Sequence, residues 1–171
     1  MKRFLKAVTA VVLTIALCGA CSSSNETKEP EASPSAALSI VVEPLTEEEY
    51  SDINTEGLGE TAAEDFSKVT VSVEMTNMIE GTERSVKMPA LKNLMTDKQI
   101  DGYWHGKGHS QNNSDEDFSE WVSENIIYRK DLTDDDIRNI FDGEEAVATY
   151  YSSGDEIEEK VIAMVDCIEF K

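Results

Sequence analysis

Residues 69–75 read Val-Thr-Val-Ser-Val-Glu-Met, an unbroken alternation of apolar and polar side chains. Successive side chains of a β-strand point to opposite faces of a sheet, so this spacing places the three valines and Met75 on one buried face. Turn-forming residues follow at 77–82, and the run 84–88 then predicts a strand that returns beside the first. The pattern therefore predicts a β-hairpin near the middle of the chain.

Strands are also predicted before and after this hairpin. Apolar character begins at residues 38–42, a short β-prone run that Pro44 closes, and we place the start of the folded domain at Leu38. Toward the other end, residues 145–152 and 156–170 form two long β-prone runs joined by a Ser-Gly-Asp turn. These two runs predict a terminal β-hairpin.

One helix is strongly predicted near the start of that hairpin. Thr133 is a favourable N-cap, three aspartates fill the first turn after it, and apolar residues recur at helical spacing through Phe141. Gly143 then supplies a typical helix end. We expect a helix of two to three turns.

A second helix and two less regular stretches rest on weaker signals. Ser114 is a candidate cap for a short helix with one apolar face, and residues 125–129 then predict a strand. The side chains on that face are Phe118, Trp121 and Val122. Residues 89–113 predict a long loop or an irregular strand pair. Residues 46–54 fit a helix capped by Thr46, an extension of the first strand or a solvated loop.

The order of these elements defines a fold class. Several short strands with turn signals and no alternation of strand and helix predict a mainly β protein, an antiparallel β-sandwich with one or two short helices. The helix before 145–152 looks like the turn that enters the penultimate strand of an immunoglobulin-like domain, and residues 148–151 resemble that strand. The two-hairpin layout resembles small Ig-like lipoproteins of Gram-positive bacteria over most of the mature chain. This resemblance implies an Ig-like topology.

The N-terminal residues have the features of an export signal. Lys2, Arg3 and Lys6 precede an uncharged stretch at 7–17 that is too short to span a bilayer of about 30 Å as a helix. Residues 17–21 read Leu-Cys-Gly-Ala-Cys, which resembles the lipobox of bacterial lipoproteins, with Cys18 where leucine is usual. The resemblance implies a signal peptide at 1–20 and a lipid on Cys21. The alternative is an ordinary secretory signal, cut after Ala20, that leaves the Cys21 thiol free.

The mature chain is expected to have a tether and one domain. Residues 22–37 are mostly Ser, Glu, Pro, Asn and Ala, with little to bury, so 21–37 is predicted to be a disordered tether and 38–171 the sandwich domain. With Cys18 removed and Cys21 lipidated, Cys167 is left without an internal disulfide partner. It lies in an apolar run, which favours a buried and unreactive thiol.

The charge limits the partners. The chain has 15 basic and 35 acidic residues, a net charge of −20, and the loss of Lys2, Arg3 and Lys6 with the signal makes it −23. Nucleic acids and anionic lipid head groups both require Lys and Arg to neutralise phosphate, so such a chain is not expected to bind them. The membrane is expected to be reached through the Cys21 lipid alone.

Few residues suggest chemistry. His105 and His109 are the chain's two histidines and are candidate metal ligands, although Gly106 and Gly108 argue against the helix that would bring them together. No nucleophile elbow, phosphate loop or zinc-protease motif is present, so neither enzymatic activity nor a cofactor is expected. The aromatic residues around the irregular stretch form a candidate binding surface, with a satellite hydrophobic cluster as the alternative. They are Tyr103, Trp104, Phe118 and Trp121.

Two functional hypotheses follow. The first is a membrane-anchored extracytoplasmic lipoprotein that acts as a binding module for an extracellular protein or glycan. The second is an accessory metal-handling lipoprotein that uses His105 and His109 with acidic neighbours.

Lipidation is testable at a single atom. Cys21→Ser is expected to abolish lipid attachment and leave the precursor uncleaved, because a serine hydroxyl is a much poorer nucleophile than a thiolate. Intact-mass analysis of the membrane fraction measures this, with Cys18→Ser as the control that changes little. Lipid on the Cys21→Ser product would contradict the assignment, as would a wild-type protein that begins at Cys21 with no added mass.

Overall fold

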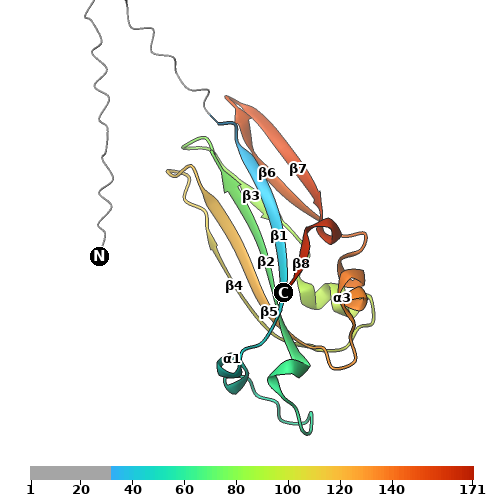
Figure 1. The fold of residues 1–171 in the computed structure, drawn as a ribbon. Coiled ribbons are helices and arrows are strands. Elements are labelled where there is room, and N and C mark those ends of the chain that lie inside the picture. The colour runs from blue at the N-terminus through green and yellow to red at the C-terminus, as the bar shows by residue number, and fades with distance from the viewer. Residues whose placement is uncertain (1–31) are drawn as a thin grey trace, which may run out of the picture. The chain divides into compact units, whose positions relative to one another are not determined.

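The computed structural model describes residues 32–171, and the predicted signal peptide and Cys21 lie outside the described residues. This part of the chain is mainly β, with eight strands, three α-helices and two 3₁₀ turns (Figure 1). The elements in chain order are β1 (Ser35–Pro44), α1 (Glu47–Ser51), η1 (Ala63–Asp65), β2 (Phe66–Thr76), β3 (Ser85–Lys87), α2 (Leu91–Asp97), β4 (Tyr103–Gln111), β5 (Ser119–Tyr128), α3 (Asp134–Phe141), β6 (Glu145–Ser153), β7 (Glu156–Ala163), η2 (Met164–Cys167) and β8 (Ile168–Phe170).

The strands form two sheets. One has five strands in the order β4-β5-β2-β1-β8, and the other has three in the order β3-β6-β7. All pairs are antiparallel except β1 with β8, which run parallel from the pair Ile40–Ile168. The predicted fold class, a mainly β antiparallel sandwich with short helices, is confirmed.

Residues 69–75, whose alternation predicted a strand, lie in β2, the central strand of the larger sheet. Val69, Val71, Val73 and Met75 are all buried, as their spacing predicted. Residues directly opposite each other in an antiparallel pair share a face, so Val71 and its partner Ile40 point into the same core. The inner face of β1 and β2 is therefore a continuous apolar surface.

Helices α2 and α3 complete the core at one end of the sandwich. The predicted helix is confirmed as α3, in which Thr133 and Asp136 form a capping box and Ile137, Ile140 and Phe141 are fully buried. These side chains belong to the main core cluster, together with residues of β1, β2 and α2. None of the helices in residues 32–171 is long and apolar enough to cross a membrane.

Two sequence-based predictions about β1 and β3 were wrong. The first strand begins at Ser35 rather than Leu38, because Ala36 is buried opposite Met75 despite its weakly apolar neighbours. The strand predicted at 84–88 is β3, but it pairs with β6 in the other sheet and not with β2. β2 has no edge left for it, since β1 and β5 occupy both sides.

The helix predicted after Ser114 was also wrong. Residues 119–128 form strand β5, so Phe118, Trp121 and Val122 share no helical face. The inward positions of β5 carry Ser119, Ser123 and Asn125 as well as two apolar residues, which hides the alternation that marks a half-buried strand.

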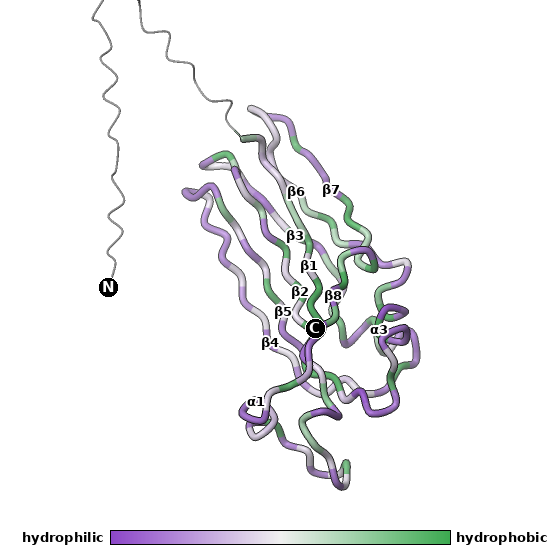
Figure 2. Tube along the Cα trace, in the orientation of Figure 1, coloured by the Kyte–Doolittle hydropathy of each residue, from purple (hydrophilic) through white to green (hydrophobic). Residues whose placement is uncertain are grey.

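The stretch 89–113 is more regular than expected. It holds α2 and the edge strand β4, and Figure 2 shows that β4 is hydrophilic over most of its length. The final strand is less regular than expected. It breaks at the 3₁₀ turn 164–167, where buried Met164 anchors the chain, and β8 then joins the other sheet.

The two capping boxes provide a matched stability test. Thr133→Ala is expected to lower the free energy of unfolding by about 1 kcal/mol, because it removes the cap of a helix that contributes three buried side chains. Thr46→Ala removes the same motif from α1, which has no buried residue. It should lower the free energy of unfolding by only a few tenths of about 1 kcal/mol, because α1 can fray without opening the core. Urea unfolding measures both. Equal losses would contradict this account of α1.

Candidate functional site

The segment between β1 and β2 folds over the outer face of the five-stranded sheet, the face turned away from the core. Alternation along β2 points Phe66 to this face, opposite to Val69. Phe66 is nevertheless fully buried, because aromatic rings surround it. The ring centroids of Tyr50, Trp104 and Tyr128 lie 5.7, 6.2 and 5.1 Å from that of Phe66. This aromatic cluster holds α1 against the sheet.

Local hydrogen bonds fix α1 itself. The Thr46 hydroxyl accepts from the Glu49 backbone N–H at 3.2 Å, and the Glu49 carboxylate accepts from the Thr46 N–H at 3.0 Å. The Tyr50 hydroxyl donates to the Thr61 carbonyl at 2.7 Å. Of the three alternatives that the sequence allowed for residues 46–54, the helix capped by Thr46 is correct.

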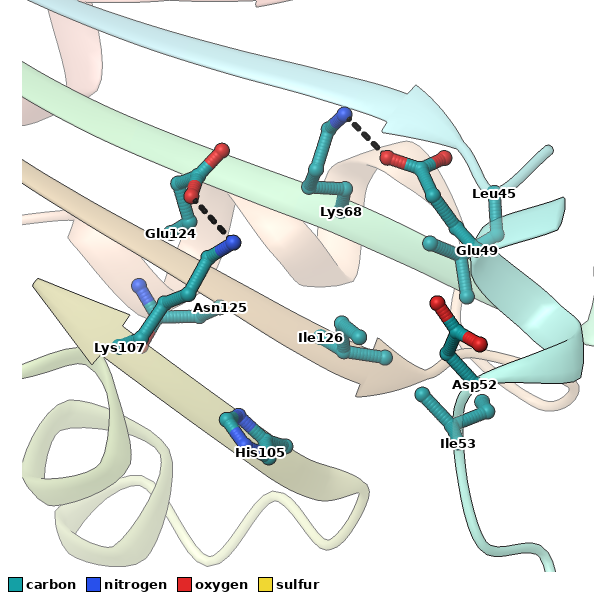
Figure 3. A pocket seen from close by; sticks show the side chains of 10 residues that line it. All are labelled: Leu45, Glu49, Asp52, Ile53, Lys68, His105, Lys107, Glu124, Asn125 and Ile126. Atoms are coloured by element: carbon teal, nitrogen blue, oxygen red, sulfur yellow. Dashed lines mark hydrogen bonds and ion pairs between the residues drawn. The ribbon is translucent and has the colours of Figure 1, made fainter.

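A pocket of about 260 Å³ lies where α1 meets the sheet (Figure 3). Its walls come from α1 and the residues beside it, and from β2, β5 and β4. The lining residues are Leu45, Glu49, Asp52, Ile53, Lys68, His105, Lys107, Glu124, Asn125 and Ile126. The pocket therefore combines apolar side chains with charged groups of both signs.

Most of these charges are already paired. The Lys68 Nζ lies 2.6 Å from Glu49 Oε1 and 3.0 Å from Glu43 Oε1, and the Lys107 Nζ lies 3.0 Å from Glu124 Oε2. The hydrogen bond from Lys68, aided by the Thr46 N–H, lowers the pKa of Glu49 from 4.5 to about 2. The same hydrogen bond raises the pKa of Lys68. Both groups are therefore charged at neutral pH.

Asp52 and His105 differ from these pairs. Within residues 32–171 the Asp52 carboxylate has no ion-pair or hydrogen-bond partner, and Figure 3 shows it beside Ile53, across from Ile126 and His105. With Glu49, Asp52 and Glu124 set against two lysines, the lining carries one unbalanced negative charge when His105 is neutral. Such a pocket favours a cationic group with an apolar stem.

The predicted metal ligands do not meet. His105 and His109 lie in β4 opposite Ile126 and Val122, so their side chains point to the same outer face. Four residues of strand separate their Cα atoms by about 13 Å, which is too far for one ion to bind both at about 2 Å. The described residues contain no group of three or more His, Cys, Asp or Glu side chains placed to hold a metal.

The predicted aromatic surface is also divided. Tyr103 packs against the main core cluster, whereas Trp121 packs against a second cluster near Met75. About six residues of β5 separate these positions, roughly 20 Å. Trp104 covers Phe66 and Phe118 is half-buried, so the four residues do not gather into one patch.

The glycines between the histidines belong to a strand and not to a loop. Gly106 lies opposite Asn125, and a Cβ at this position would lie 2.2 Å from the Tyr103 hydroxyl oxygen and 2.5 Å from Asn125 Oδ1. Gly106 therefore allows the chain to pass close to the half-buried Tyr103 hydroxyl and the buried Asn125 amide. This close approach keeps β4, with His105 and Lys107, at the rim of the pocket.

Cys167 has the environment expected of an unreactive thiol. It is a free, half-buried cysteine, and its Sγ donates to the Ala163 carbonyl at 3.5 Å. Burial, with a smaller contribution from the charge of Asp166, raises the pKa of the thiol. Cys167 is therefore protonated at neutral pH, the less nucleophilic form.

No family model matches the chain, and no curated protein or solved structure is significantly similar to it. The candidate site is therefore assigned from its own residues. Sequence reasoning overlooked Glu49, Asp52, Lys68 and Ile126, which come from three separate elements. The Thr46-x-x-Glu49 capping pattern was the available signal for the helix that positions the first two.

The Lys68–Glu49 pair predicts a pH dependence. Because folding lowers the pKa of Glu49, its contribution to stability is complete above about pH 4.5 and is lost as the pH falls toward 2. Glu49→Gln is therefore expected to be less stable than wild type at pH 7, and the difference should shrink between pH 4.5 and 2. Urea unfolding at several pH values measures this, with the exposed neighbour Glu48→Gln as the control. A constant difference across that range would contradict the role of this pair.

Proposed function

We propose that the protein is a lipid-anchored binding module held on the extracytoplasmic face of the cell membrane. The lipobox-like residues 17–21 support the anchor, and the polar stretch before β1 supplies the length of a tether. A strongly acidic domain attached in this way is kept in solution beside an anionic membrane. Its ligands are expected to carry positive charge.

The topology proposed for this module is immunoglobulin-like. If β1 to β7 are named A to G, the larger sheet has the order D-E-B-A and the smaller sheet C-F-G, the two sheets of a constant-type domain. The pairing of β8 with β1 adds a parallel contact at the end of the last strand. The order of strands supports this assignment independently of any sequence motif.

The observation that carries the ligand class is the exposed Asp52 carboxylate, which lies beside the apolar side chain of Ile53 and across from that of Ile126 (Figure 3). A pocket volume of about 260 Å³ suits an amine or guanidinium on a short apolar stem, since drug-sized ligands bind in pockets of roughly 300–1,000 Å³. Asp52 provides the counter-charge, whereas Glu49 and Glu124 already have lysine partners. The same chemistry is offered by a small free amine and by a Lys or Arg side chain of a partner protein.

Binding of a defined cation tests this proposal. N-butylammonium and an N-acetylated lysine amide are titrated into the purified mature chain and followed by NMR shifts of residues around Asp52 and Ile126. Both should bind, and Asp52→Asn should weaken binding about tenfold, the equivalent of about 1.4 kcal/mol. Tighter binding of a lysine-containing peptide than of the free amine would indicate a protein ligand.

Two controls set the specificity. Asp155→Asn removes an exposed carboxylate at the β6–β7 turn and should leave the affinity unchanged. Butyrate has the same apolar stem with the opposite charge and should not bind. Equal binding of butyrate and butylammonium, or no shift with either cation, would overturn the assignment of this pocket.

A further inference from the structure

Strand β7 is an open edge of the three-stranded sheet. It pairs with β6 on one side and has no strand partner on its other side within residues 32–171. Seven of its eight residues are exposed, and only Ile162 is half-buried. In this part of the chain, the backbone groups along this edge have no main-chain partner and are available to another chain, except near Lys160, whose side chain reaches across to the Ala36 carbonyl of β1.

Two apolar side chains of this strand face the solvent. Ile157 is 60% exposed and Val161 is 55% exposed, the large hydrophobic residues that stand out on the described surface. Their cross-strand partners on β6 are Tyr151 and Val147, so the four share the outer face of the sheet. An apolar patch beside an unpaired edge is a feature of protein interaction sites.

The charges along β7 are mostly negative. Glu156, Glu158 and Glu159 project from the strand, and the single cation Lys160 is already used, because its Nζ donates to the Ala36 carbonyl at 2.7 Å. Glu158 also accepts a hydrogen bond of 3.1 Å from the Tyr150 hydroxyl. The edge therefore presents apolar contacts separated by carboxylates.

We propose that β7 binds an extended segment of a basic partner protein, which adds to the sheet as a new strand. In this arrangement main-chain hydrogen bonds supply affinity and alternate side chains supply specificity. Apolar side chains of the partner lie opposite Ile157 and Val161, and Lys or Arg lie opposite Glu158 and Glu159. The recognised segment thus has five residues: an apolar residue at each end, and between them two basic residues and one further residue opposite Lys160.

A second copy of this chain is a poor occupant of the same edge. Antiparallel pairing of residues 157–161 of two copies would place Glu159 opposite Glu159 and Glu158 opposite Lys160, whose Nζ already donates to a carbonyl of β1. Parallel pairing in register would set each glutamate against itself. Like charges directly opposite each other destabilise strand pairs. The glutamates therefore oppose self-association and favour a basic segment.

A synthetic peptide tests the proposal. A peptide with the centre Ile-Glu-Lys-Lys-Val matches β7 in antiparallel pairing, and the reversed centre Val-Lys-Lys-Glu-Ile matches it in parallel pairing. Either is titrated into the purified full mature chain, with affinity measured by calorimetry and pairing by amide hydrogen exchange. We expect one of them to bind and to slow exchange of β7 amides. Absence of binding by both peptides would overturn the proposal.

Charge and edge variants separate strand addition from general attraction. Glu159→Lys is expected to weaken binding about tenfold, because one cross-strand attraction becomes a repulsion, whereas Glu169→Lys makes the same charge change on β8 and should have little effect. Val161→Thr tests the apolar contact and should also weaken binding. Equal losses for Glu159→Lys and Glu169→Lys, or binding without slower exchange in β7, would overturn strand addition.

The pocket near Asp52 and the β7 edge can be tested independently. Asp52→Asn should leave peptide affinity unchanged, because Asp52 lies beside α1 on the five-stranded sheet and β7 belongs to the other sheet. Loss of peptide binding in Asp52→Asn, with β7 variants unaffected, would overturn the β7 site and assign the basic segment to the pocket.

Discussion

Burial of one face of β2 is the constraint on which the rest of the structure depends. Ten residue pairs join β2 to β1 and ten join it to β5, so a single strand fixes the register of both neighbours. A slip of one residue would move Val69, Val71 and Val73 from the core to solvent. The same register decides which side chains reach the outer face, and so places Lys68 of β2 beside Glu124 and Ile126 of β5.

The elements that could be predicted are those whose signals are local. Thr133, the aspartates after it and the spacing of Ile137, Ile140 and Phe141 all specify one helix within a dozen residues, and α3 forms as expected. The alternation in β2 is equally local. Only the end of β5 was predicted, as a strand at 125–129, because Ser119 and Asn125 occupy buried positions that carry apolar residues in most strands. Their hydrogen bonds to Asn112 and to the Val69 carbonyl make this burial tolerable, and those partners are remote in sequence.

The candidate pocket was hidden for a related reason. Its residues are ordinary surface residues when considered one by one, and they acquire a common role only after α1 folds onto the sheet. His105 and His109 were singled out because histidine is rare in this chain and the two are four residues apart. In a strand, residues four apart are separated by more than twice the distance that separates them in a helix, so this spacing does not bring the two side chains together. Composition therefore indicates the sign of the ligand that we propose, and the position of the pocket follows only from the topology.

Two of the edge strands of the sandwich, β4 and β7, protect their open edges in different ways. β4 carries Gly106 and Gly108, has no large apolar side chain among residues 105–111, and presents Lys107, whose side chain is 73% exposed. Such an edge offers an added strand little to pack against, which is a common protection against unwanted pairing. β7 instead keeps Ile157 and Val161 in solvent and relies on glutamates for protection. Protection by charge of one sign opposes pairing with acidic strands but attracts basic ones, so β7 selects among added strands, whereas the polar edge of β4 disfavours all of them.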